Sequence, residues 1–163
     1  MIFASVGSML PFERFVRAVD AWAGANPGTE VFIQTGDHQY APVHARFASM
    51  IPIDEYRQRL RDCDLFVAHV GMGSIMQALE ERKQTLMMPR HASLGEHTTD
   101  HQLHTAERFG HLPGLRIVDT AEDLQHNMTA LLQTPMVVGP AISQQASPAL
   151  IDGVRRFLQS ASA

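Results

Sequence analysis

Short apolar runs alternate with amphipathic helical stripes along the whole sequence, and this alternation limits the possible folds more than any single motif does. The stripes have apolar residues at helical spacing, as between Phe12 and Trp22. The apolar runs lie at 2–7, 31–36, 46–50, 65–70, 85–89 and 115–118. Strands that alternate with helices form a parallel sheet covered by helices on both faces. We therefore expect residues 1–163 to form a single α/β domain with a sheet of about six strands.

Composition and charge exclude several classes of protein. The 163 residues are 45% hydrophobic and 18% charged, which is typical of a globular chain. A net charge of −4, without an extended lysine or arginine cluster, argues against a nucleic-acid partner. Cys63 is the only cysteine, so no internal disulfide can form, and no apolar stretch is long enough to span a bilayer. We therefore expect a cytoplasmic protein.

Four loops rich in glycine, histidine and polar residues follow predicted strands, at 7–11, 36–45, 71–74 and 90–101. In a parallel sheet the C-terminal ends of all strands meet at one edge, and ligands bind outside that edge. We therefore expect these loops to contribute to a binding site.

The segment Gly71-Met72-Gly73-Ser74 ends a predicted strand and starts a predicted helix. The N-terminus of a helix has unpaired N–H groups and a partial positive charge, and glycines let a phosphate approach them. Ser74 would donate to the anion or cap the helix. In the alternative interpretation the glycines only make a tight turn. A third glycine is missing at Met76 and no Gly-Lys-Ser/Thr occurs, which argues against a dinucleotide cofactor and an ATPase.

The segment 90–102 is long and polar for a strand-to-helix connection, as functional loops often are. Asp100 can accept two sugar hydroxyls, and Gln102 can both donate and accept. Arg90 can form a bidentate pair with a carboxylate or phosphate. The alternative is a solvated loop in which Asp100 caps the next helix.

Three histidines suggest a different chemistry. His97, His101 and His104 are spaced to share one helix face, which can make a zinc site. Glu96 precedes the pair His97 and His101 instead of standing between them, so the hydrolase pattern is incomplete. We therefore expect no metal site.

Four segments read FASVGS (3–8), IQTG (33–36), HVGMGS (69–74) and GEHTTDHQ (95–102). In this order they resemble the C-terminal, donor-binding domain of glycosyltransferase family 28. The likeness covers residues 2–110. It is strongest to the stand-alone subunits of bacterial exopolysaccharide two-component glycosyltransferases and to the catalytic subunit of the dolichol-linked N-acetylglucosaminyltransferase.

The resemblance implies a Rossmann-like C-terminal half of a GT-B fold that binds a UDP-sugar. It implies transfer of the sugar with inversion, without a bound metal or other cofactor. A membrane-anchored partner subunit would supply the acceptor-binding site for a lipid-linked sugar and recruit the chain to the inner face of the membrane. A homo-oligomer and a non-catalytic binding or scaffolding subunit stay open as alternatives.

The resemblance also assigns residues to the donor. Three segments would contact it, and they contain Gly7 and Ser8; Gly71, Met72, Gly73 and Ser74; and Asp100, His101 and Gln102. The ribose-binding glutamate of the family falls on Gln77, whose neutral amide binds hydroxyls less strongly than a carboxylate.

The identity of the donor sugar and of the general base rests on a few residues. The implied sugar is glucuronate or N-acetylglucosamine, and Arg90 with His91 would pair with a uronate carboxylate. His69 and His91 are the candidate general bases in this chain, although the partner is better placed to supply the base.

Overall fold

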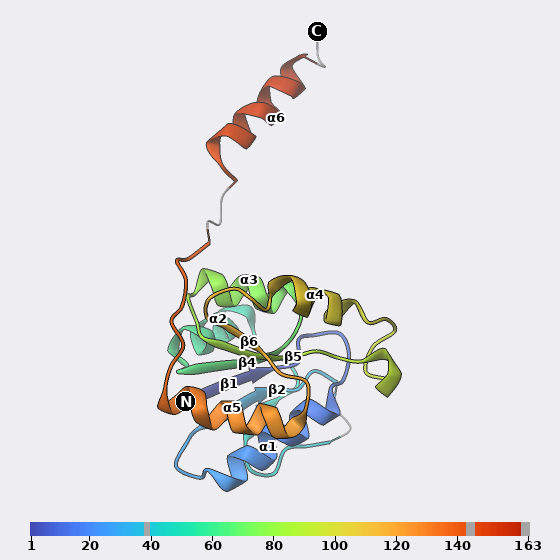
Figure 1. Cartoon of the computed structure of the whole chain (residues 1–163), viewed down its shortest axis with the longest axis vertical. Helices are drawn as coiled ribbons and strands as arrows, with labels where there is room; N and C mark the ends of the chain where they lie inside the picture. Colours follow the sequence, from blue (N-terminus) through green and yellow to red (C-terminus); the bar gives the residue numbers. More distant parts are fainter. Residues whose placement is uncertain (38–39, 143–145, 161–163) are drawn as a thin grey trace.

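A six-stranded parallel sheet forms the centre of the computed structural model, which describes residues 1–37, 40–142 and 146–160 (Figure 1). The spatial order of the strands is β3, β2, β1, β4, β5, β6. Their bounds are Ile2–Ser5 (β1), Val31–Gln34 (β2), Arg46–Ala48 (β3), Leu65–His69 (β4), Thr85–Met88 (β5) and Leu115–Ile117 (β6). The prediction of an α/β fold with a parallel sheet is confirmed. Each strand ends one or two residues before the end of its predicted run.

The central strands are buried on both faces. Phe3 of β1 lies opposite Phe32 of β2 and Phe66 of β4. Every residue of β1, β2 and β5 is buried. Continuous apolar runs are expected where helices cover both faces of a parallel sheet, because neither side of the strand then meets water.

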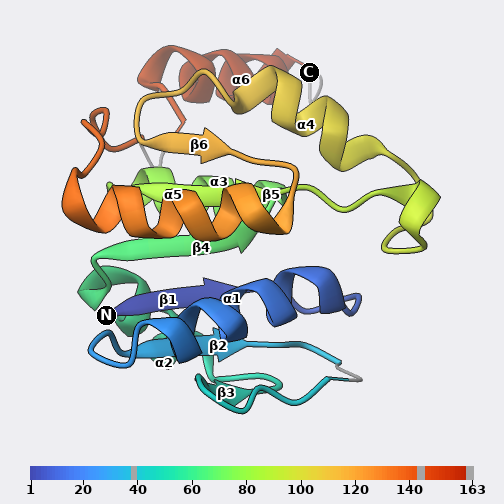
Figure 2. The same ribbon diagram turned by 60° about the horizontal axis from the view of Figure 1, so that its bottom comes forward.

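Helices cover the two faces of the sheet (Figure 2). One face carries α1 (Glu13–Ala25) and α5 (Ala121–Gln133), and the other carries α2 (Ile53–Asp62), α3 (Met72–Glu80) and α4 (His101–Phe109). On the first face Phe15, Val19 and Trp22 of α1 share a core with Leu124 and Met128 of α5. This arrangement confirms the prediction of helices on both faces.

The connections out of β1 and β4 lead to opposite faces of the sheet. β1 pairs with β2 on one side and with β4 on the other. β1 continues into α1 on one face, and β4 continues into α3 on the other. The two loops therefore diverge, and a crevice opens at the C-terminal ends of these two strands.

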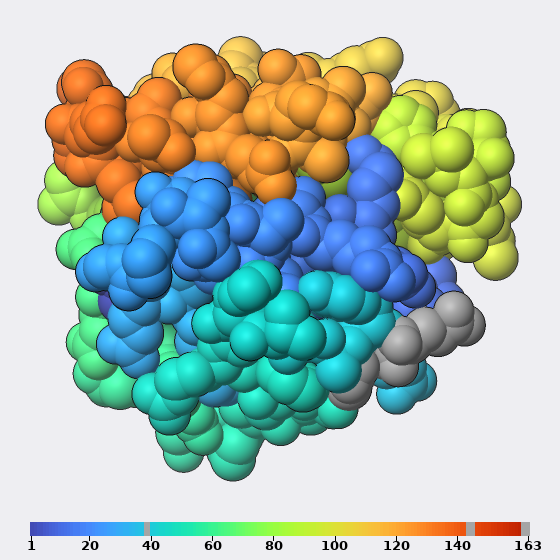
Figure 3. Space-filling model, turned by 90° about the horizontal axis from the view of Figure 1, so that it is seen from below, coloured from blue at the N-terminus to red at the C-terminus, as the bar shows by residue number. Residues whose placement is uncertain are grey.

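A buried aspartate fastens the segment that follows β2 to α1. Asp20 Oδ1 accepts hydrogen bonds from the N–H groups of His44 and Ala45 at 2.9 and 2.8 Å. Its Oδ2 accepts from the Tyr40 hydroxyl at 2.6 Å and from the N–H of Val43 at 3.0 Å. Asp20 is completely buried. In Figure 3 the residues after position 40 lie directly against α1, and these four bonds hold them there.

The last helix, α6 (Pro148–Ser160), stands apart from the sheet and its covering helices (Figure 1). None of its residues is buried. It exposes one apolar face that consists of Leu150, Ile151, Val154, Phe157 and Leu158. Within the part of the chain that the structure describes, no helix is long and apolar enough to cross a membrane.

Candidate functional site

A cavity of about 400 Å³ lies at the C-terminal ends of β1, β2 and β4. Its walls come from the loop after β1, the end of β2, the connection from β3 into α2, the end of β4 and the first turns of α3. The cavity therefore occupies the crevice that the divergence of the β1 and β4 loops creates.

The residues predicted for the donor site divide into two groups. Those that line the cavity are Gly7, Ser8, His69, Gly73, Ser74, Gln77 and Arg90. Those outside its lining are Gly71, Met72, His91, Asp100, His101 and Gln102. In the predicted loop at 36–45, residues 38–39 lie outside the described residues, and none of the others lines the cavity.

Two of the predicted glycines make room for an imidazole ring. A Cβ at Gly7 would lie 2.7 Å from His69 Cε1, and a Cβ at Gly71 would overlap His69 Nε2. Gly7 also has a φ of +82°, in the left-handed region that favours glycine. Gly73 differs, because a Cβ there would meet nothing within 4 Å. The ring of His69 thus explains the absence of a side chain at Gly71, whereas the protein itself gives no steric reason for Gly73.

The helix α3 begins beside the cavity with Gly71 as its N-cap residue, so the alternative in which Ser74 caps the helix is wrong. The first helical hydrogen bond runs from the N–H of Ile75 to Gly71 O at 3.0 Å. The N–H groups of Met72, Gly73 and Ser74 precede it and have no acceptor within the helix. They give this wall of the cavity a partial positive charge.

The side chain of Ser74 lies beside the buried Tyr56. The Tyr56 hydroxyl hydrogen bonds with both Ser5 and Ser74, and burial raises the pKa of Tyr56. Tyr56 is 8% exposed. A hydroxyl can rotate its proton, so Ser74, which lines the cavity, can donate toward it.

The apolar side of the cavity is formed by Val6, Met9, Met50, Ile51, Ile53 and Tyr56. Sequence reasoning missed all of these except Met9, which lies in the predicted loop 7–11. Ile53 and Tyr56 belong to the apolar stripe of α2, and such a stripe predicts core contacts instead of ligand contacts. Sequence reasoning also missed Gln34, which donates to Gly7 O and accepts from the N–H of Ile51, both at 3.3 Å. Its signal was a polar residue at the C-terminal end of an otherwise apolar strand.

Arg90, which was expected to pair with a uronate, is bonded inside the protein. It is 3% exposed, and its Nη2 donates to Val6 O at 3.0 Å and to Leu10 O at 2.5 Å. Its guanidinium lies over the ring of Phe12, 4.9 Å from the centroid. Burial lowers the pKa of Arg90 to about 10, so the charge persists at neutral pH. Its Nη2 therefore serves the loop after β1, and its buried Nε has no partner among the described residues.

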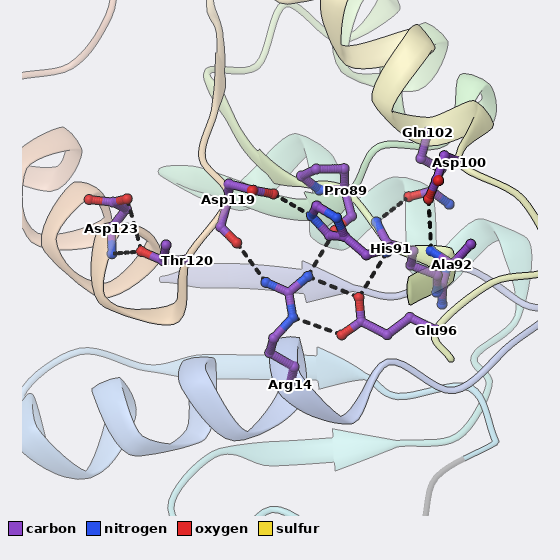
Figure 4. Close-up of polar contacts among 11 residues, drawn as sticks. Arg14, Pro89, His91, Ala92, Glu96, Asp100, Gln102, Asp119, Thr120 and Asp123 are labelled. Carbon is purple, nitrogen blue, oxygen red and sulfur yellow. Dashed lines mark hydrogen bonds and ion pairs between the residues drawn. The ribbon is translucent and has the colours of Figure 1, made fainter. Parts of the chain in front are cut away.

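The residues expected to contact the sugar hold their own loop together (Figure 4). Gln102 Oε1 accepts from the N–H of Arg90 at 3.0 Å, and Asp100 Oδ1 accepts from the N–H of Ala92 at 2.8 Å. Asp100 is the N-cap residue of α4 but makes no capping bond, so the capping alternative is wrong. Gln102 is buried, whereas Asp100 and His101 are exposed.

The two histidines predicted as general bases differ in position. His69 lines the cavity, and its Nδ1 is buried without a hydrogen-bond partner among the described residues. The Nε2 of His91 pairs with Asp119 Oδ1 at 2.5 Å, outside the cavity lining (Figure 4). The structure therefore does not support His91 as a base for this cavity, nor as a free group for a uronate.

A family model agrees with this geometry. It is described as the glycosyltransferase family 28 C-terminal domain, and it matches residues 1–154. The chain belongs to glycosyltransferase family 28. The resemblance carried by the four sequence segments is thereby confirmed, and the match extends it through β6 and α5 into α6. A comparison of the family 28 domain with curated protein sequences gives no significant match.

Solved structures similar to the family 28 domain include two glycosyltransferases. The glycotransferase of kitacinnamycin is 21% identical with a TM-score of 0.60, and the spinosyn forosaminyltransferase SpnP is 16% identical with a TM-score of 0.54. Each alignment covers 82% of this chain and 35% of the other. At these identities the likeness concerns the fold, which is the Rossmann-like C-terminal half of a GT-B enzyme. The family 28 domain spans about a third of the length of these proteins.

The family 28 domain does not bring the three histidines onto one helix face. His101 and His104 lie in α4, but His97 precedes it, and its ring centroid is 4.3 Å from that of His101. Across residues 1–37, 40–142 and 146–160, no three His, Cys, Asp or Glu side chains are grouped to hold a metal ion. The zinc alternative therefore has no structural support in the described part of the chain.

We expect the stability of the family 28 domain to fall between pH 6.5 and 4 because of His69. Burial and, to a smaller extent, the charge of Arg90 together lower the pKa of His69 from 6.5 to about 4. In this interval the unfolded chain binds a proton that the folded chain does not, so the free energy of unfolding decreases by about 3 kcal/mol as the pH falls. Urea unfolding at a series of pH values measures this change in the free energy of unfolding. His69→Asn should flatten this part of the profile, and a parallel profile would contradict the assignment.

Proposed function

We propose that this chain is the donor-binding subunit of a two-component, inverting UDP-sugar glycosyltransferase. In this proposal residues 1–163 bind the nucleotide sugar, and a membrane-anchored partner subunit binds a lipid-linked acceptor in polysaccharide synthesis. The observation that carries the proposal is the composition of the cavity. It combines an apolar slot, a hydroxyl and amide pair at Ser74 and Gln77, and the N-terminus of α3.

The N-terminus of α3 would hold the diphosphate. The N–H groups of Met72, Gly73 and Ser74 suit phosphate oxygens, and Gly73 leaves the space above them open. When the sugar leaves, negative charge grows on the UDP diphosphate, and fixed N–H dipoles stabilise that charge without reorganisation. The neutral imidazole of His69 would add a hydrogen bond at the same end of the cavity.

The rest of the nucleotide would fit the opposite walls. Gln77 lines the cavity one turn after Gly73, and its amide can bind ribose hydroxyls. The apolar side chains of Met50, Ile51 and Ile53 offer a surface on which a flat pyrimidine can lie. A cavity of about 400 Å³ is within the usual range for small-ligand sites.

The sugar would lie toward the loops after β1 and β5. Gly7 and Ser8 line the cavity, and the exposed Asp100 and His101 stand on the other loop. Asp100 uses Oδ1 within the loop, so its Oδ2 is the oxygen we assign to a sugar hydroxyl. Glucuronate and N-acetylglucosamine are the candidate sugars.

The acceptor hydroxyl must lose a proton to a general base. His69 is the candidate in this chain because it lines the cavity, but a pKa of about 4 makes its imidazole a weak base at pH 7. We assign the base to the partner subunit, since the chain spans 35% of the length of the similar solved glycosyltransferases and the acceptor site would be on other polypeptide. The same partner would bring this cytoplasmic subunit to the membrane.

Calorimetric titration of the whole chain tests the proposal. We expect UDP and at least one of UDP-glucose, UDP-glucuronate and UDP-N-acetylglucosamine to bind with one-to-one stoichiometry, and GDP-glucose to bind much more weakly. We expect this preference because the wall of Met50, Ile51 and Ile53 is assigned to a pyrimidine, which is smaller than a purine. Absence of binding by every UDP compound, or equal binding of GDP-glucose, would contradict the proposal.

A non-catalytic scaffolding subunit is the second candidate, and one residue favours it. The family resemblance implies a ribose-binding glutamate at the position of Gln77, and an amide binds hydroxyls less tightly. A mixture of this chain, its partner subunit, a UDP-sugar and a lipid-linked acceptor separates the two. Product only in the complete mixture supports the enzyme, whereas tight association without product supports the scaffold.

A further inference from the structure

The segment 91–100, between β5 and α4, is not ordered by the hydrophobic core. None of its ten residues is buried. Leu94, its largest apolar side chain, is 61% exposed. Because little apolar area is removed from water here, the position of the segment depends on polar contacts. The segment leads into Asp100 and His101, so its position determines where these two residues lie.

Arg14, in the first turn of α1, connects this segment to the rest of the protein (Figure 4). Its Nε and Nη2 donate to the two carboxylate oxygens of Glu96 at 2.7 and 2.9 Å. Its Nη1 donates to Asp119 O at 2.6 Å, and its Nη2 also donates to Pro89 O at 3.1 Å. One guanidinium thus joins α1, directly after the β1 loop, to the loops after β5 and β6.

Glu96 carries the same constraint into its own segment. Its Oε2 accepts from the N–H of His91 at 3.0 Å, and its N–H donates to His91 O at 3.1 Å. The side chains of Arg14 and Glu96 are 23% and 11% exposed. A bidentate pair that is largely shielded from water restricts geometry more than an exposed pair does. Figure 3 shows the segment against the beginning of α1.

We infer that the Arg14–Glu96 ion pair is a positioning device for the sugar end of the donor site. This inference rests on the proposed function, which assigns the sugar to the segment that ends at Asp100 and His101. With the pair intact the segment is already in place before the donor arrives. Without the pair, part of the binding free energy must be used to order it. Neither Arg14 nor Glu96 needs to touch the donor.

The inferred role of the ion pair concerns the sugar end of the donor site and not the nucleotide end. The cavity takes its walls from residues 6–9, 34, 50–56 and 69–77, and Arg90 is the lining residue nearest to the segment in sequence. Arg90 is fixed independently, because it bonds Val6 O and Leu10 O and its N–H bonds Gln102. Loss of the ion pair should therefore weaken binding of the sugar while binding of UDP stays the same.

The experiment compares UDP with a UDP-sugar by calorimetry in Glu96→Ala, Glu96→Gln and the parent chain. The sugar nucleotide is whichever of UDP-glucose, UDP-glucuronate and UDP-N-acetylglucosamine binds the parent chain most tightly. In Glu96→Ala we expect its affinity to fall about tenfold, a size typical of binding that must also order a loop, with UDP unchanged. Glu96→Gln keeps an acceptor oxygen for Arg14. Its affinity for the sugar nucleotide should therefore lie between that of Glu96→Ala and that of the parent chain.

Glu13→Ala is the matched control. Glu13 pairs with Arg17 at 2.7 Å in the same helix, but this pair is 38% and 56% exposed and lies within α1. Glu13→Ala should change neither the affinity for UDP nor the affinity for the sugar nucleotide. The loss of affinity for the sugar nucleotide in the double variant Arg14→Ala with Glu96→Ala should be smaller than the sum of the losses in the two single variants, because the two residues act together.

Two failures are distinguishable. If the parent chain binds no UDP, the proposed function fails. If the parent chain binds UDP and the UDP-sugar, and Glu96→Ala lowers both affinities equally or neither, the positioning role fails, because a purely structural contribution does not discriminate between the two ligands.

Discussion

Replacement of Gly73 by alanine is expected to weaken binding of UDP by about tenfold or more while the protein stays fully folded. An added Cβ would meet no protein atom within 4 Å, so the free domain accommodates it. Gly73 is the second residue of α3, and alanine in a helix is about 1 kcal/mol more favourable than glycine. Any loss of affinity then reports contact between the new methyl group and the ligand. Calorimetry with UDP and thermal unfolding measure the two effects.

Gly28→Ala provides the control for this substitution. Gly28 lies between α1 and β2, and a Cβ there also meets nothing within 4 Å. The connection from α1 to β2 leads into the N-terminal end of a strand, whereas the cavity lies at the C-terminal ends. Gly28 is therefore on the opposite side of the sheet from the cavity. The control should bind UDP like the parent chain. Unchanged affinity in Gly73→Ala would mean that no diphosphate approaches the start of α3.

Replacement of Asp20 by alanine is expected to lower the free energy of unfolding by about 4 kcal/mol. The substitution leaves three backbone N–H groups, of which that of Ala45 is buried, and the Tyr40 hydroxyl without their acceptor. Burial alone would raise the pKa of Asp20, but the hydrogen bonds from Tyr40, Val43, Ala45 and His44 outweigh it and hold the pKa below the usual value. Urea unfolding at pH 7 measures the loss.

Two further measurements separate the carboxylate from the general effect of substitution. Tyr40→Phe removes one of the four donors and should cost about 1 kcal/mol. Asp152→Ala, in an ion pair that is 57% exposed at the aspartate, should cost less than about 0.5 kcal/mol. Because the pKa of Asp20 is lowered, its contribution is present above its unfolded pKa and is lost as the pH falls through the folded pKa. An Asp20→Ala effect no larger than that of Asp152→Ala would contradict the assignment.

The order of strands and helices could be predicted because apolar periodicity reports burial directly. A threonine followed three residues later by an acidic residue, as at Thr120 and Asp123, is typical of a helix start. The helix α5 does begin there, and the Thr120 side chain accepts from the Asp123 N–H at 3.0 Å. The strand ends could not be placed to the residue, since apolar character continues past the last paired residue. Periodicity also predicts α6 but says nothing about what its apolar face contacts, because a stripe is the same whether it is covered or exposed.

The site was only partly predictable, because a sequence gives donors and acceptors but not their partners. Gln102 and Arg90 have the chemistry to bind a sugar, yet they bond each other and nearby carbonyls. Gly71 and Gly73 look equivalent in sequence, but the ring of His69 requires the first and not the second. Tyr56 of the apolar wall was missed because it packs in the core and lines the cavity at once.

The position of the His69 ring between Gly7 and Gly71 limits how the sequences of family members can change. Gly7 and Gly71 are 64 positions apart, yet both lie where a methyl group would collide with the imidazole of His69. An alanine at either site forces the ring of His69 to move, and replacement of the histidine first or in the same step removes the collision. Homologues with a side chain at either glycine should therefore carry a smaller residue in place of His69, and this covariation can be read from an alignment alone.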